Sequence, residues 1–263
     1  MHLHIGSLDD AAWYSPWRRH RVGEKVFCSM SLVATALLAP TWPGTLLVSL
    51  AAVAFICGWA RIRPGVLLAA ISAPVVFLLL GAASVLLSVG QSAVDAWWQL
   101  GWLSIGETSM RQAAKLFAHG IAGTLAVMVL ATTTPMVDLL TWGRRLRIPD
   151  PLLEIANLTY RLLFVLLDTA ITVFEAQRCR LGDDPVGPGA FRRRWSNLAA
   201  GIGQVGVLAW SRASVLNEGL THRGFEDSLV TLPVARPASP KLLGGSAAVV
   251  AAIWAISLVV TNL

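Results

Sequence analysis

The stretch GVLLAAISAPVVFLLLGAASVLLSVG, residues 65–90, contains no charged side chain. As an α-helix it would be about 39 Å long, which exceeds the roughly 30 Å of hydrocarbon in a bilayer. The whole chain of 263 residues has the same character, with 55% hydrophobic and only 14% charged residues. Soluble domains carry about 25% charged residues. The sequence therefore predicts an all-α, polytopic helical membrane protein.

Apolar segments on both sides of this stretch predict further membrane spans. The five predicted spans are residues 26–38, 45–60, 65–88, 112–133 and 242–260. Residues 20–25 could extend the first, which is short, and Pro74 is expected to kink the third. The connection at 90–109 contains several tryptophans, which favour the headgroup layer of a membrane. We expect it to be a loop beside the third and fourth spans.

The distribution of basic residues predicts the orientation of the chain. With five spans, the Lys and Arg residues at 18–25, at 61–63 and throughout 135–241 all fall on one side. Cytoplasmic loops retain Lys and Arg, so the amino terminus and the long segment are predicted to be cytoplasmic, in a cell inner membrane. The same rule explains the net charge of +6. We expect no nucleic-acid partner, because no nucleic-acid-binding motif accompanies the charge.

A long mixed segment separates the last two spans and divides the chain into three parts. We expect an amino-terminal lead with four spans at 1–134, a cytoplasmic helical region at 135–240, and a final span at 241–263. Three helices are predicted within the middle part, at 135–146, 151–181 and 192–222.

The two longer helices of the middle part carry distinct patterns. A polar stripe recurs every seven residues along the first of them: Glu154, Arg161, Asp168 and Glu175. Small residues that would let another helix cross closely lie on one side of the second: Ala199, Gly203 and Gly206. Arg192–Arg194 favour contact with anionic membrane lipid and retention on the cytoplasmic side.

Two short cationic motifs end these helices. They are Ala176-Gln177-Arg178-Cys179-Arg180-Leu181-Gly182 and Leu220-Thr221-His222-Arg223-Gly224-Phe225-Glu226. Glycine accepts the left-handed backbone that closes a helix, so each motif is expected to project an arginine from an exposed helix tip. We predict that a soluble protein docks there. The residues expected to contact it are Ala176, Gln177, Arg178, Arg180, Leu181, Gly182, His222, Arg223, Gly224 and Phe225.

The sequence offers little for catalysis. It contains no GxxxxGK[ST] phosphate loop, no GxSxG elbow and no HExxH helix. We therefore expect no catalytic residues, no cofactor and no metal site. His2 and His4 are interpreted as part of a terminal tail, although an amine and imidazoles could bind a transition metal.

At the two motifs the sequence resembles the transmembrane (T) component of energy-coupling factor transporters, and most of all the cobalt-type CbiQ proteins. Arg180-Leu181-Gly182 and Arg223-Gly224-Phe225-Glu226 match the forms of that branch. The likeness extends to the lead into the first span, from Ser15-Pro16-Trp17 through Lys25. It also includes Pro135–Pro149 followed by Leu158-Thr159-Tyr160-Arg161. The chain departs from the family in having His222 where alanine is usual, and Leu181 between the arginine and the glycine.

The resemblance implies a non-catalytic subunit of an importer. Arg180 and Arg223 would each enter a groove of one of two copies of an ATP-binding cassette ATPase and pair with acidic residues. A substrate-binding membrane subunit, CbiM-like, alone or with a CbiN-like protein, would pack on the same scaffold. The helices would then transmit ATPase motion to that subunit, for uptake of cobalt toward cobalamin.

Two alternatives to this function stay open from the sequence. One is a coupling subunit for nickel or a vitamin, because another chain selects the substrate. The other is a membrane scaffold that recruits soluble proteins without transport.

Overall fold

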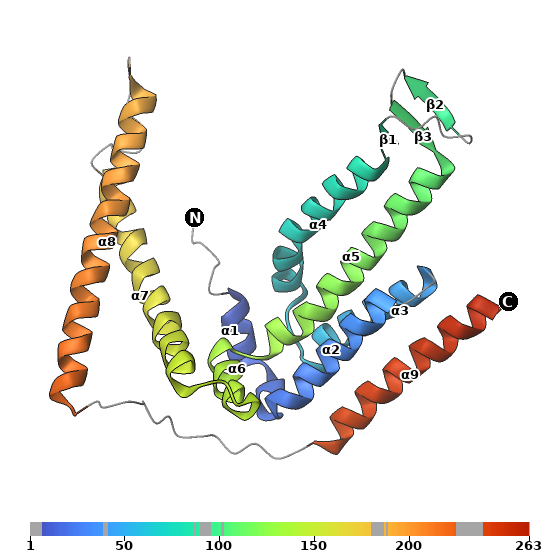
Figure 1. Cartoon of the computed structure of the whole chain (residues 1–263), viewed down its shortest axis with the longest axis horizontal. Coiled ribbons are helices and arrows are strands. Elements are labelled where there is room, and N and C mark those ends of the chain that lie inside the picture. Colours follow the sequence, from blue (N-terminus) through green and yellow to red (C-terminus); the bar gives the residue numbers. More distant parts are fainter. Residues whose placement is uncertain are drawn as a thin grey trace. The chain divides into compact units, whose positions relative to one another are not determined.

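The computed structural model describes residues 7–38, 42–86, 88–89, 96–100, 103–179, 187, 189–224 and 239–262 (Figure 1). The chain forms two compact units. The first, unit 1, contains Met1–Leu139 and Val234–Leu263, and the second, unit 2, contains Leu140–Pro233. Unit 2 is thus an insertion between two parts of unit 1.

Unit 1 is a helical bundle preceded by a short lead. The lead consists of α1 (Ser7–Tyr14) and the 3-10 turn η2 (Pro16–Arg19). The bundle consists of α2 (Val22–Leu38), α3 (Trp42–Val53) with its π-helical continuation η3 (Ala54–Trp59), α4 (Pro64–Leu86), α5 (Glu107–Thr133) and α9 (Pro240–Asn262). These helices confirm the predicted positions of all five apolar segments. The fourth begins five residues earlier than predicted, and the first extends back to Val22.

The core of unit 1 forms around α5, which packs against α2, α3 and α4, while α9 packs on α2 and α3 (Figure 1). Leu32, Val48, Ile56 and Val129 are at most 1% exposed and belong to one apolar cluster. Gly120 of α5 faces the side chain of Leu78 on α4, so these two helices approach closely. By contrast, one group of large apolar side chains of α4 is exposed, as expected where lipid covers a helix: Leu68, Val76, Phe77, Leu79 and Leu80.

Four helical stretches are long and apolar enough to cross a membrane. They are Pro64–Leu86, Glu107–Thr133, Asp150–Cys179 and Leu242–Val259, with Pro43–Trp59 as a shorter apolar helix. The chain is therefore a multi-pass helical membrane protein. This set differs from the five predicted spans in two respects. It does not include α2, which contains the first predicted span, 26–38. It includes Asp150–Cys179, which we predicted to be cytoplasmic, because that helix is apolar apart from its widely spaced charges.

A small antiparallel sheet connects α4 with α5, where the sequence analysis expected a loop. Its strands are β1 (Ser88–Val89), β2 (Ala96–Leu100) and β3 (Leu103–Gly106), in the order β1-β3-β2. Gln99 pairs with Ser104, and Leu100 with Leu103. Aromatic residues favour strands, so the tryptophans of this connection support extended structure as well as a place near the headgroups. The sheet is too small to change the all-α class.

Unit 2 consists mainly of two long helices, α7 (Asp150–Cys179) and α8 (Ala190–His222). The helix α6 (Met136–Gly143) and the turn η4 (Arg144–Leu146) precede them, and α6 spans the boundary between the units. Asp150 begins α7, where a negative charge suits the helix dipole, and its Oδ1 lies 3.2 Å from Arg144 Nε. The predicted helices of the middle segment are therefore confirmed to within about two residues.

Candidate functional site

The helices α7 and α8 approach each other closely at one glycine of α8. Gly201 of α8 is buried, and a Cβ there would lie 3.2 Å from the ring of Phe174 on α7. A larger residue at this position would push the helices apart. The close contact with α7 does not use Gly203 or Gly206, which have nothing within 4 Å of a Cβ among the described residues, so the crossing predicted there stays a prediction. Spacing alone could not show which glycine faces α7.

Arg212 of α8 makes a second, polar contact across the pair. Its guanidinium donates to the carbonyl oxygen of Val165 at 3.0 Å and also to Thr169 Oγ1. Thr169 Oγ1 in turn donates to the same carbonyl oxygen at 2.7 Å, and Thr169 is 8% exposed. This charge-assisted bond holds α8 to the middle of α7. The sequence analysis did not single out Arg212, because an isolated arginine in a polar helix carries no distinguishing signal.

Two cavities open between the same helices. The larger, of about 530 Å³, has Asp168, Thr172, Gln177, Gln204 and Arg212 in its lining. The smaller, of about 360 Å³, is mostly apolar. The polar stripe predicted on α7 is divided: Asp168 lines the larger cavity and Arg161 the smaller, whereas Glu154 is buried. Arg212 lines both cavities.

Large apolar side chains remain exposed around much of the circumference of α8. The most exposed of them are between 57% and 78% exposed: Phe191, Trp195, Ile202, Val207, Trp210 and Val215. Exposed aromatic patches of this kind mark contact with protein partners or lipid. Arg192–Arg194 are exposed at the beginning of the same helix.

The second cationic motif forms the end of α8. His222 is the last helical residue, and Arg223 is the residue that caps the helix. The backbone N–H of Arg223 donates to Leu220 O at 3.1 Å, and that of Gly224 to Thr221 O at 3.0 Å. Gly224 has φ +72°, the left-handed conformation that glycine adopts without penalty. His222, Arg223 and Gly224 are all exposed. Phe225 lies outside the described residues.

The first motif is described only in part. Ala176 and Gln177 lie in the last turns of α7 and line the larger cavity, while Arg178 is exposed. Arg180, Leu181 and Gly182 lie outside the described residues. The roles predicted for both motifs therefore stay predictions.

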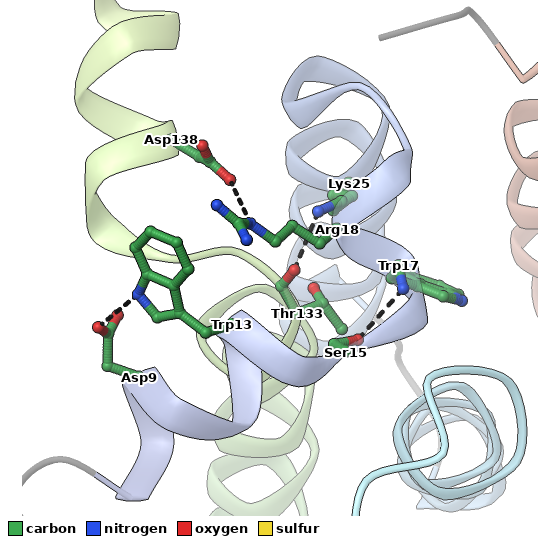
Figure 2. A network of polar contacts seen from close by, with 8 residues as sticks. All are labelled: Asp9, Trp13, Ser15, Trp17, Arg18, Lys25, Thr133 and Asp138. Carbon is green, nitrogen blue, oxygen red and sulfur yellow. Dashed lines mark hydrogen bonds and ion pairs between the residues drawn. The ribbon is translucent and has the colours of Figure 1, made fainter. Parts of the chain in front are cut away.

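A group of charges at the amino end of unit 1 was not predicted from the sequence (Figure 2). Lys25 is 0% exposed and Glu24 is 8% exposed, both in the first turn of α2. Arg18 lies between the ring of Trp13 and the carboxylate of Asp138. The basic residues of this region were interpreted through the charge rule for cytoplasmic loops and through the family resemblance of the amino-terminal lead, neither of which predicts a buried charge. Burial of a charge depends on helix packing, which the sequence alone does not display.

Known proteins resemble the chain along most of its length. The profile of one family, CbiQ, described as cobalt transport protein, matches residues 14–232. The cobalt transport protein CbiQ of Rhodobacter capsulatus is 34% identical over 243 residues, which are 92% of this chain and 93% of that protein. The cobalt transport protein CbiQ of Salmonella typhimurium is 27% identical over 180 residues, covering 66% of this chain and 79% of its own.

A third similarity reaches a longer protein. A protein of Methanocorpusculum labreanum, named as a candidate fused cobalt transport protein CbiMQ, is 24% identical over 230 residues. The matched part is 86% of this chain but 37% of that protein.

Proposed function

The chain belongs to the CbiQ family of cobalt transport proteins, and we propose that it is the energy-coupling membrane subunit of an ATP-driven cobalt importer. Unit 1 is the membrane-embedded part and unit 2 receives the motion of the ATPase. The observation that carries the proposal is the end of α8, where a glycine-closed helix exposes Arg223. The chain itself is proposed to be non-catalytic, with ATP hydrolysed by a partner.

The two long helices suit the transmission of force. At 30 and 33 residues, α7 and α8 are each about 45–50 Å long. They contact each other through Gly201 and through Arg212, so movement of one tip is passed to the other helix. In the proposal, Arg180 and Arg223 each enter one of two ATPase subunits and pair with acidic side chains. The contacts run antiparallel, so the carboxyl ends of α7 and α8 lie at opposite ends of the pair, and each would follow the ATPase subunit that it contacts.

A second partner is proposed to cover exposed apolar side chains of α8. The name of the M. labreanum relative joins CbiM with CbiQ in one protein, which supports a CbiM-like substrate-binding subunit as this partner. A CbiN-like protein is a further proposed member of the complex. The exposed Arg192–Arg194 are proposed to contact anionic lipid at the cytoplasmic face of the inner membrane.

The orientation proposed for the chain places unit 2 and the amino terminus in the cytoplasm. We also propose the division of the chain into 1–134, 135–240 and 241–263, with residues 135–240 acting as the coupling region. Although α7 is apolar enough to span a membrane, its charges at 154, 161, 168 and 175 would be costly in lipid. Contact with α8 and partner subunits offers those charges a better environment.

The test is binding of the ATPase to Arg223→Ala. Truncating one partner of a desolvated charge pair costs about 2–5 kcal/mol, a loss of roughly 30-fold or more in affinity. We expect the detergent-solubilised variant to lose the ATPase and to lose ATP-driven cobalt uptake. Arg180→Ala is expected to behave in the same way. Membrane insertion should be unchanged.

A control lies in unit 1. Arg111 of α5 is exposed and belongs to neither motif, so Arg111→Ala should keep the ATPase. Recovery of the ATPase with Arg223→Ala at the wild-type ratio would contradict the proposal.

A further inference from the structure

The insertion of unit 2 leaves two places where the chain passes between the units. The chain leaves unit 1 after α5 and the first turn of α6, and it returns before α9. Force on unit 2 that travels along the covalent chain enters unit 1 at these two places. Side chains from one short segment, residues 13–25, contact both of them. Figure 2 shows the contacts of Arg18 and Lys25 where the chain leaves unit 1.

Lys25 holds the end of α5, where the chain leaves the bundle. Its Nζ donates to the carbonyl oxygen of Thr133 at 2.9 Å, and the lysine is completely buried. Thr133 is the last residue of α5, so its carbonyl has no partner within the helix. A cation at this position also suits the negative end of the helix dipole. Lys25 thus fixes the exit point to α2.

Glu24 holds the beginning of α9, where the chain returns. Its Oε1 accepts a hydrogen bond from the backbone N–H of Ser239 at 2.9 Å, one residue before α9 starts. A capping glutamate within a helix makes this same bond to the residue that precedes its first turn. Here the carboxylate comes from α2 instead. Its other oxygen, Oε2, is buried and has no hydrogen-bond partner within the described part of the chain.

Arg18 holds the first turn of α6. Its Nε lies 3.9 Å from Asp138 Oδ2, and its Cζ lies 3.9 Å from the centre of the Trp13 ring. Trp13 Nε1 donates to Asp9 Oδ2 at 3.0 Å, which orients that ring (Figure 2). The arginine is therefore fixed on one side by an aromatic face and on the other by the acidic residue at the start of α6.

Trp17 anchors this segment in the bundle. It is 1% exposed and packs edge-on against Phe55 and Trp59 of η3. The backbone N–H of Trp17 donates a hydrogen bond to Ser15 Oγ at 3.3 Å. The segment is thus attached to the membrane bundle through an apolar contact and to the points of passage through charges.

From these contacts we infer that Arg18, Glu24 and Lys25 form a latch that passes movement of the coupling region into the membrane bundle. The inference rests on the proposed function. The three are positioning residues: they hold α6, the end of α5 and the start of α9 at fixed places on α2 and its lead. Without the latch, the ATPase would still bind and hydrolyse ATP, but the bundle would follow its motion less closely.

The experiment measures coupling in proteoliposomes that contain the complete transporter. The quantity is the number of ATP molecules hydrolysed per Co²⁺ ion taken up, together with the amount of ATPase bound. For Glu24→Ala and Lys25→Met we expect this ratio to rise about tenfold or more, because a buried group loses its partner. Arg18→Gln should raise it less, by up to about fivefold, since this pair is partly exposed.

Matched variants separate coupling from folding. Arg19 is adjacent to Arg18 but exposed, so Arg19→Gln should leave the ratio unchanged. The exchange Arg18→Asp with Asp138→Arg should recover part of the coupling lost by either single change. If Glu24→Ala does not assemble, Glu24→Gln, which keeps an acceptor oxygen, and the Arg18 variants decide the question.

Two results would overturn the latch. In one, uptake and hydrolysis fall together and the ratio stays constant, which indicates a structural role only. In the other, every variant couples like the wild type. Both differ from failure of the proposed function, which would appear as ATPase binding and cobalt uptake that survive Arg223→Ala.

Discussion

Apolar side chains from every helix of unit 1 meet in one cluster, whereas α7 and α8 of unit 2 meet mainly each other. The cluster extends from Trp17 in the lead to Ile253 in α9. In unit 2, the large apolar side chains of α8 stay exposed instead. A helix pair with so little buried surface depends on what covers it. Under the proposed function, lipid would complete unit 1 and protein partners would complete unit 2.

The strongest test of this comparison replaces one exposed aromatic residue in each unit. Trp210 of α8 is 78% exposed and Phe77 of α4 is 75% exposed. Buried tryptophans at protein interfaces contribute about 2 kcal/mol or more, roughly 30-fold in affinity. Trp210→Ala should therefore reduce co-purification of the CbiM-like subunit, while Phe77→Ala should not. If both variants keep or both lose the CbiM-like subunit, the exposed side chains of α8 and of α4 do not differ in what covers them.

A second test concerns the crossing of α7 and α8. Gly201→Val places methyl groups against the Phe174 ring, and such overpacking costs about 1–3 kcal/mol. We expect faster amide hydrogen exchange in α7 and α8 and unchanged exchange in α2–α5. Amide exchange in unit 1 should not respond to Gly201→Val, because the core of unit 1 does not include the contact between Gly201 and Phe174.

The control for this second test is Gly206→Val on the same helix. It makes the same chemical change at a position with open space around it. Similar exchange rates in the two variants would mean that Gly201 does not set the crossing.

Much of the fold could be predicted because local signals decide it. Uncharged stretches and Pro or Gly boundaries placed the helices, and Asp150 with Pro151 marked the beginning of α7. The small sheet between α4 and α5 was missed, since strand pairing depends on residues apart in the chain. The crossing at Gly201 was missed for a related reason. Several glycines of α8 have suitable spacing, and only packing selects one.

The helix tip at Gly224 could be predicted from the sequence, but Arg212 and the latch residues could not. A glycine after a basic helix end signals a helix tip, and Gly224 has the conformation that this signal implies. Arg212 and the latch residues gave no such signal. Glu24 and Lys25 resemble any charges beside a membrane span until α5 and α9 are placed around them. Their partners are more than 100 residues away in sequence.

The smallest expected effect is at the tip itself. Gly224 has φ +72°, and an alanine forced into this conformation costs about 1–2 kcal/mol. Gly224→Ala should therefore loosen the end of α8, with faster exchange of its last amides and weaker ATPase binding. Gly224→Asn should lose less, because asparagine tolerates the left-handed region. Gly219→Ala is the control, within the same helix and in open space, and it should be neutral or slightly stabilising. Because Gly224→Ala changes only the end of α8, it tests the helix end separately from the contact between α7 and α8 at Gly201. If alanine and asparagine at 224 behave alike, the left-handed turn does not orient Arg223.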